Sequence, residues 1–281
     1  MPAYVLLALL TLSLLGYLLF LVQTLMRRPL PYDADAVPPR WHALHAFGVL
    51  LLFLVFAVDA QAGSQFVAAV FDRPTNGQFA LAVQIVLMYV ANGFTLFVIF
   101  SIAARSGAPR LMLGLSGPGA ARSVYQGLVM FILFVPLEIA FPVVVDRLYE
   151  VFLHKTPPPQ DALAAFLTAD WPLVVLMTLA AVVVAPIFEE LIFRGFIQRG
   201  FERTLGKPIA VAATAVIFAS VHTGSAIGVK VLPLAIVLSV AYARSRNIVA
   251  NMVFHSLFNA SSLAVVLVAR HAGLDFGVGY P

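Results

Sequence analysis

The sequence predicts an all-α fold, a polytopic bundle of about eight transmembrane helices. Of the 281 residues, 62% are apolar and only 11% are charged, whereas soluble chains are about 45–50% apolar and about 25% charged. The apolar residues also form long stretches near the length of about 20 residues that a helix needs to cross the hydrocarbon core. Cysteine is absent, which excludes disulfides, cysteine-bound metals and thiol nucleophiles.

Eight apolar segments carry this prediction, each followed by a polar or Pro/Gly-containing connection. The fifth segment is long and the sixth is short, so we expect one of them to be tilted or partly re-entrant. The first has no basic residues before it and is longer than a cleavable signal peptide, so we expect it to remain. The segments are 3–26, 43–62, 79–104, 124–145, 172–198, 208–222, 226–243 and 248–269.

Basic residues are distributed unevenly over the connections. Of the 17 Lys and Arg side chains, eleven lie in one set of alternate loops and five in the other, and Arg194 lies inside the fifth segment. Because basic loops stay in the cytoplasm, we expect both termini outside. The size and the Ala, Leu and Val content suggest a multi-pass protein of a prokaryotic plasma membrane.

Ionisable side chains inside the apolar segments are costly and therefore need a reason. Five of the seven fall in the last four segments. We accordingly expect three regions: N-terminal helices and loops over 1–170, a polar-bearing helical core over 171–269, and a short tail over 270–281. The seven side chains are Asp59, Glu138, Glu189, Glu190, Arg194, His222 and His255.

Two adjacent acids in the fifth segment have different surroundings. Glu190 and Arg194 are four residues apart, the favourable arrangement for a pair on one helix face. Glu189 has Phe193 at that spacing instead. We expect one carboxylate to be neutralised as scaffold and the other to remain free for proton chemistry. The alternative is that both acids pair with Arg194 and Arg199 near the helix end.

The other polar residues of this core lie on two further helices. His222 follows Phe218 by four residues, and His255 and Asn259 share a helix face at the same spacing. Taken separately, they could be a helix cap and an interhelical hydrogen-bonding pair. Together with the acids they could activate a water and stabilise an oxyanion, the two requirements of peptide hydrolysis.

The order of these motifs resembles a known family. E-E-x-x-x-R, F-x-x-x-H and H-x-x-x-N, in this order and each in its own span, are similar to the CAAX protease and bacteriocin-processing (CPBP, Rce1/Abi-type) intramembrane proteases. Pro186 before the acids and Gly195 after the arginine fit the same pattern. The resemblance covers about residues 171–268, and the first four helices are too generic to match. Its matching positions are Glu189, Glu190, Arg194, Phe218, His222, His255 and Asn259.

The resemblance implies a role for each position. It makes Glu189 and His222 the residues that activate the attacking water. It makes Glu190 and Arg194 supporting residues, and it assigns oxyanion stabilisation or water positioning to His255 and Asn259.

The family is often described as metalloproteases, which leaves the cofactor open. Glu189, His222 and His255 would resemble a His₂Glu zinc site with an open position. Metal-free activation of water by the glutamate is the alternative, and we slightly favour it, with zinc still possible. No His-Glu-x-x-His string occurs to separate the two.

The expected function is therefore that of an intramembrane endopeptidase with its active site toward the cytoplasm. The expected substrate is a membrane-embedded or lipidated protein or peptide in the bilayer, with CaaX-type or C-terminal sorting-signal processing as the reaction and no nucleic acid involved. A non-proteolytic immunity or scaffold protein of the same family is one alternative. A proton-coupled transporter is another, although no internal repeat supports it. Asp59 and Glu138 have no place in this scheme.

Overall fold

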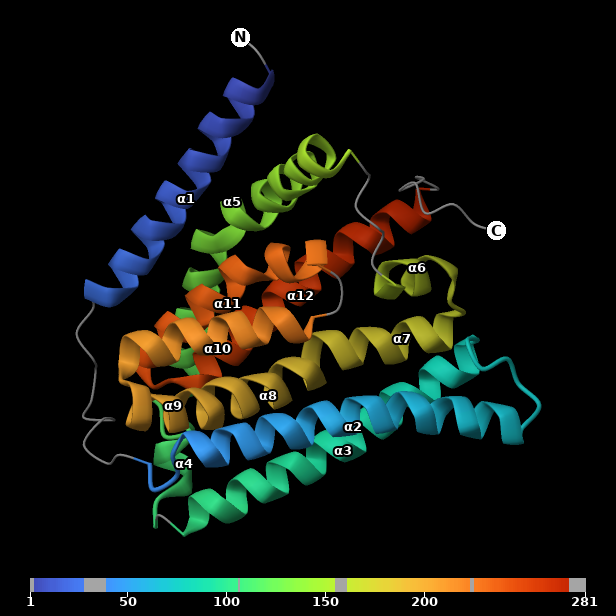
Figure 1. Cartoon of the computed structure of the whole chain (residues 1–281), viewed down its shortest axis with the longest axis horizontal. Coiled ribbons are helices and arrows are strands. Elements are labelled where there is room, and N and C mark those ends of the chain that lie inside the picture. The colour runs from blue at the N-terminus through green and yellow to red at the C-terminus, as the bar shows by residue number, and fades with distance from the viewer. Residues whose placement is uncertain (1–2, 28–38, 106, 155–160, 223–224, 273–281) are drawn as a thin grey trace.

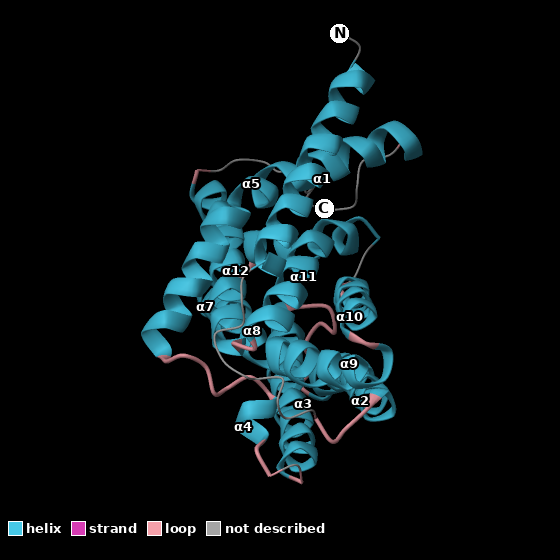
Figure 2. Cartoon of the chain, turned by 90° about the vertical axis from the view of Figure 1, so that its left-hand side faces the viewer, coloured by secondary structure: helices cyan, strands magenta, loops and turns pink. Residues whose placement is uncertain are grey.

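A computed structural model describes residues 3–27, 39–105, 107–154, 161–222 and 225–272 of the chain. These residues form helices and short connections, and no strand occurs among them (Figures 1 and 2). Seven of the helices are long and apolar enough to cross a membrane. The predicted all-α multi-pass membrane fold is confirmed. The connection over 28–38 and most of the tail over 270–281 lie outside the described residues.

The N-terminal half contributes six helices. The hairpin of α2 and α3 lies along one side of the bundle, whereas α1 and α5 lie on another (Figure 1). The Tyr17 hydroxyl donates a hydrogen bond of 2.7 Å to the Leu133 carbonyl, which joins α1 to α5. The bounds are α1 Ala3–Arg27, α2 Ala43–Val70, α3 Gln78–Ala104, α4 Pro109–Met112, α5 Ala120–Leu153 and α6 Asp161–Thr168.

One continuous helical rod of 35 residues, Trp171–Leu205, crosses the molecule and opens the C-terminal half. Two stretches of it are π-helical, a local widening that is frequent at functional sites. The rod consists of α7 Trp171–Leu179, η1 Ala180–Val184, α8 Ala185–Glu189, η2 Glu190–Gln198 and α9 Arg199–Leu205. The remaining helices are α10 Lys207–Val221, α11 Ser225–Ser245 and α12 Ile248–His271.

The sixth predicted span, over 208–222, is also the short one in the structure, and it is too short to count as a span of its own. In the structure it is α10, an apolar helix of only 15 residues, which at 1.5 Å per residue is about 22 Å long. That is shorter than the hydrocarbon core of about 30 Å, so seven long helices replace the expected eight spans. α10 begins directly after α9 and ends at Val221, and His222 follows it as the C-cap residue.

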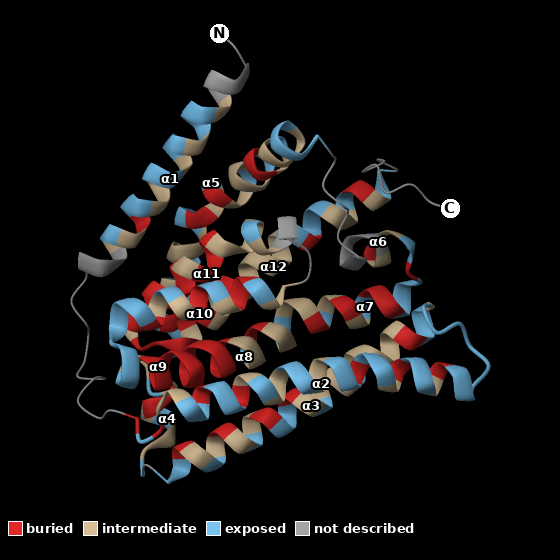
Figure 3. Ribbon diagram, viewed as in Figure 1, coloured by how far each residue is buried: buried red, intermediate tan, exposed pale blue. Residues whose placement is uncertain are grey.

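The most buried part of the molecule surrounds η2 (Figure 3). All nine residues of η2 are buried, and aromatic side chains fill the space around them. Trp41 stacks on Phe196 with ring centroids 4.8 Å apart, and its indole N–H donates to the Phe196 carbonyl. The outer faces of the helices instead expose large apolar side chains such as Phe66, Phe97 and Ile139, as helices in contact with lipid tails do.

Basic connections meet at one end of the bundle, at the left of Figure 1. Arg246 forms two hydrogen bonds with the Glu202 carboxylate, of 3.0 and 2.7 Å. Arg203 donates to the Pro39 carbonyl, and Arg40 donates to the Arg105 carbonyl. The loops that the charge distribution assigned to one membrane side are therefore joined directly to one another.

Candidate active site

Glu190 is the buried centre of the polar cluster. Its side chain is 0% exposed and accepts three hydrogen bonds. Arg194 Nη1 lies 2.9 Å from Oε1, His255 Nδ1 lies 3.0 Å from the same oxygen, and Asn251 Nδ2 lies 3.1 Å from Oε2. A carboxylate needs such partners to remain charged away from water. The predicted Glu190–Arg194 pair is confirmed as an ion pair.

Asn251 is a member of this cluster that the sequence analysis missed. Its amide also donates to the Leu238 carbonyl at 2.8 Å, so it fastens α11, α12 and η2 together. The signal was present in the sequence, since Asn251, His255 and Asn259 follow one another at intervals of four residues and share one face of α12.

Glu189 lies beside the same cluster with a different exposure. Its side chain is 22% exposed, and its Oε2 lies 3.8 Å from Nε2 of His255. Because Glu190 accepts from Nδ1 of that ring, Nε2 is the nitrogen turned toward Glu189. The two adjacent acids therefore meet opposite edges of one imidazole.

The ring of Phe218 contacts Arg194 and both histidines of the site. The Arg194 guanidinium stacks over it at 4.1 Å from the centroid. The imidazole centroids of His222 and His255 lie 4.6 and 5.8 Å from that of Phe218. The F-x-x-x-H motif thus brings its histidine to the cluster by packing both histidines against one aromatic ring.

His222 has one ring nitrogen engaged by the backbone. Its Nδ1 lies 2.7 Å from the Phe218 carbonyl oxygen. Because a carbonyl oxygen can only accept, Nδ1 carries the hydrogen in this bond, which leaves Nε2 as the lone-pair nitrogen of the neutral ring. No direct contact joins His222 to Glu189 among the described residues; His255 is the histidine closer to that acid.

Asn259 is held by the first π-helical stretch. Its Nδ2 donates to the Ala181 carbonyl of η1 at 2.7 Å. A π-turn displaces backbone carbonyls from the ordinary helical pattern and so makes them available to a neighbouring helix. The second amide hydrogen and the carbonyl oxygen of Asn259 remain for other partners.

The other two intramembrane acids lie apart from this cluster. Asp59 is exposed on α2. Glu138 accepts hydrogen bonds from Ser261 and Ser262 across the contact of α5 with α12. Tyr89 of α3, in contrast, is an unpredicted neighbour: its ring lies 6.0 Å from that of Phe188, and it is within electrostatic reach of Glu189.

The donor set does not fit the zinc site that the sequence left open. Within the described residues, no three His, Cys, Asp or Glu side chains are grouped so that they could share one metal ion. A metalloprotease assignment is therefore not supported.

Comparison with known families identifies this part of the chain. Residues 171–261 match the family described as type II CAAX prenyl endopeptidase Rce1-like. The chain carries an Rce1-like domain. The matched region includes every member of the cluster from Glu189 to Asn259, and the predicted resemblance is confirmed for these residues. No curated protein and no solved structure matches the chain.

The Rce1-like domain supplies the rod, α10, α11 and most of α12. The helices before it pack around the domain: α2 and α3 lie along the rod, and α5 lies along α12 (Figure 1). The polar cluster is therefore enclosed by the Rce1-like domain and covered in part by helices outside the matched region.

Proposed function

We propose that this protein is an intramembrane endopeptidase that hydrolyses a peptide bond of a membrane-associated protein or peptide. The observation that carries the proposal is the contrast between two adjacent glutamates. Glu190 is fully buried with three partners, whereas Glu189 is 22% exposed and faces a histidine nitrogen. Such a division gives one acid a structural role and leaves the other available for proton transfer.

Glu189 is the general base in this proposal. Its Oε2 and Nε2 of His255 are 3.8 Å apart, a separation at which one water can bond to both. Glu189 takes a proton from this water while the water oxygen attacks the peptide carbonyl carbon. The protonated Glu189 then gives its proton to the amide nitrogen as the carbon–nitrogen bond breaks, so that a new carboxyl end and a new amine end form.

His255 positions the water, and Glu190 positions His255. The hydrogen bond from Nδ1 to Glu190 directs Nε2 toward Glu189. A histidine whose second nitrogen is fixed by a carboxylate keeps one tautomer and one orientation, as in other hydrolytic sites. Arg194 and Asn251 complete this support by holding the Glu190 carboxylate.

His222 and Asn259 are the proposed contacts to the reacting peptide. His222 keeps Nε2 for a substrate or water because Nδ1 is bonded to Phe218. Asn259 keeps one amide hydrogen after donating the other to Ala181, and that hydrogen can stabilise the negative oxygen of the tetrahedral intermediate. The role of Asn259 agrees with the one that the family resemblance implies, whereas the resemblance would make His222 a partner of Glu189 in activating the water.

The substrate class follows from the surroundings of the cluster. The helices around the site expose apolar side chains, which supports a membrane-embedded or lipidated protein or peptide as the substrate. CaaX-type and C-terminal sorting-signal processing are the two candidate reactions. The basic end of the bundle points to the cytoplasm under the positive-inside rule.

Comparison of protein termini in whole membranes tests the proposal without a known substrate. Cells carry wild type, Glu189→Gln or Glu138→Gln at matched membrane levels, and newly formed peptide termini are quantified by mass spectrometry. We expect termini that are present with wild type and Glu138→Gln and absent with Glu189→Gln. Identical termini in all three strains, with every variant folded, would favour a non-proteolytic immunity or scaffold protein.

A further inference from the structure

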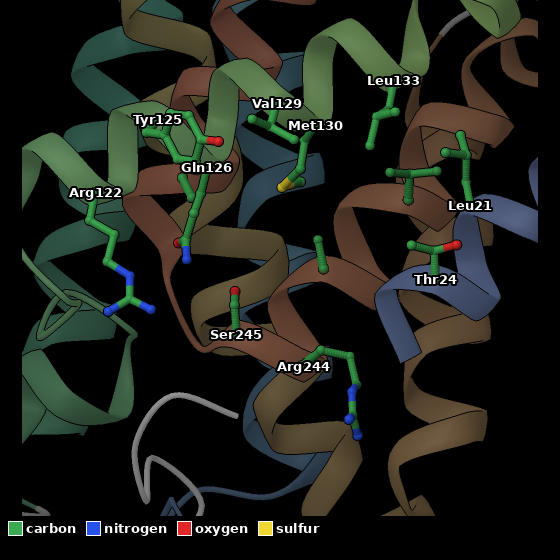
Figure 4. Close-up of a pocket in the computed structure, with 13 residues that line it drawn as sticks. Leu21, Thr24, Arg122, Tyr125, Gln126, Val129, Met130, Leu133, Arg244 and Ser245 are labelled. Carbon is green, nitrogen blue, oxygen red and sulfur yellow. The ribbon is translucent and has the colours of Figure 1, made fainter. Parts of the chain in front are cut away.

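A cavity apart from the polar cluster is lined by residues of α1, α5, α11 and α12 (Figure 4). It has a volume of about 270 Å³ and lies between α1, α5, α11 and the start of α12. Its apolar wall includes Leu21, Met130 and Val237, and two arginines, Arg122 and Arg244, also line it. Most of these residues are outside the part of the chain that matches the Rce1-like family.

The two faces of α11 separate this cavity from the candidate active site. Carbonyls of Leu238 and Ser239 accept hydrogen bonds from Asn251 and Gln198, on the side of the polar cluster. Val237, Ala241 and Arg244 line the cavity instead. Changes made in the cavity wall can therefore leave the Glu190 network in place.

The polar lining is concentrated toward one end of the cavity. Arg122 and Gln126 belong to the first turns of α5, and Arg244 and Ser245 belong to the last turn of α11. Leu133, three turns along α5, lies well away from Arg122 (Figure 4). This end is also the basic end of the bundle, where Arg246 and Arg203 meet their partners.

We propose that this cavity binds one anionic phospholipid. Its acyl chain lies along the apolar wall, and its phosphate lies at the level of Arg122 and Arg244. Arginine is well suited to phosphate because its planar guanidinium donates several hydrogen bonds at once. Basic pockets between transmembrane helices at the cytoplasmic side bind such headgroups. The cavity is smaller than most small-molecule pockets, and its size suits part of one acyl chain.

Charge complementarity distinguishes an anionic lipid from the bulk lipid around the protein. None of the residues that line the cavity is acidic, and two are arginines. A zwitterionic headgroup also carries a positive group, which the two arginines repel, so its net attraction to the cavity is weaker. The bound lipid also touches Leu21 and Thr24, so it adds a contact between α1 and the helices that pack against it.

Native mass spectrometry of the full-length protein in detergent tests the proposal. The probes are phosphatidylglycerol and phosphatidylcholine with identical acyl chains, and bound lipid is counted at equal added concentrations. Wild type is expected to retain one phosphatidylglycerol in preference to phosphatidylcholine. Arg122→Ala should weaken this binding about fivefold, as expected for one basic residue near a lipid phosphate. Arg110→Ala is the matched control, because Arg110 is exposed at the same end but does not line the cavity.

A second variant tests the apolar wall. Val129→Trp places a larger side chain in the cavity and should remove the retained lipid without removing either arginine. Thermal unfolding supplies an independent readout, since a lipid that binds only the folded state raises the midpoint. Phosphatidylglycerol should raise the midpoint of wild type and of Arg110→Ala, with a smaller rise for Arg122→Ala.

Three results would overturn the proposal. If Arg122→Ala and Arg110→Ala lost equal amounts of bound phosphatidylglycerol, the lipid would be held by a diffuse attraction to the basic surface. Undiminished retention by a folded Val129→Trp protein would place the lipid elsewhere. If glycerol phosphate displaced the lipid at the concentration at which the lipid itself binds, the apolar wall would contribute nothing to binding.

Discussion

His255 Nδ1 lies 3.0 Å from Oε1 of Glu190, in a position where neither side chain is more than 3% exposed. This bond decides which edge of the imidazole meets Glu189. It also makes the structural acid and the proposed base depend on one another through a single ring. Variants of the two acids separate the two roles, because loss of Glu190 should disturb folding and loss of Glu189 should not.

Glu190→Ala should destabilise the protein by about 3–5 kcal/mol, because it leaves the buried charge of Arg194 without its carboxylate. Glu189→Gln should change stability by less than about 1 kcal/mol, since Glu189 is partly exposed and the variant keeps its shape. Thermal unfolding in detergent measures both. Similar midpoints for the two variants would contradict the division of roles.

Asn251→Ala should destabilise the protein by about 1–3 kcal/mol, because it leaves the Leu238 carbonyl and one Glu190 oxygen short of a buried donor. Asn251→Asp should be worse, since it places a second carboxylate against Glu190. Asn76→Ala, in an exposed loop, is the control and should have little effect. The unfolding midpoint should be highest for Asn76→Ala, lower for Asn251→Ala and lowest for Asn251→Asp. Any other order would argue against a role for Asn251 in the cluster.

Gly127 marks a close approach of α5 to α12. A Cβ there would lie 2.7 Å from both the Ala250 carbonyl oxygen and the Val253 side chain. Gly127→Ala should therefore cost about 1–3 kcal/mol, as over-packing does. Gly93→Ala on α3 is the matched change, because a Cβ there meets nothing within 4 Å. If both variants unfold at the wild-type midpoint, the two helices are not packed as closely as described.

Trp41→Phe tests the connection between the segment before α2 and the π-helical stretch. The variant keeps an aromatic ring against Phe196 but loses the indole donor to the Phe196 carbonyl. We expect a loss of about 1–2 kcal/mol, which the shift of the unfolding midpoint measures. An unchanged midpoint would mean that this hydrogen bond contributes nothing net.

Residue spacing in the sequence predicted the features that depend on a single helix. The apolar stretches gave the helical membrane fold, and the four-residue interval predicted the ion pair of Glu190 with Arg194. The same interval marked Phe218 and His222, whose rings are 4.6 Å apart in the structure. Each of these pairs lies on one helix, so one helical turn was enough to infer it.

Contacts between helices could not be inferred in the same way. Asn251 and Glu190 are 61 positions apart, and Trp41 and Phe196 are 155 apart, so no periodicity relates them. The π-helical stretches were also missed, because a change from an i+4 to an i+5 hydrogen bond leaves the apolar pattern nearly unchanged.

Hydrolysis in ¹⁸O-labelled water by purified protein tests the central proposal most directly, once a membrane-derived substrate peptide is in hand. Wild type should place one ¹⁸O in each new C-terminal carboxylate, and Glu138→Gln should do so at a similar rate. Glu189→Gln, with an unchanged unfolding midpoint, should be slower by at least about a hundredfold, the lower range for loss of a general base. Cleavage by Glu189→Gln at the wild-type rate would contradict the assignment of Glu189 as the base.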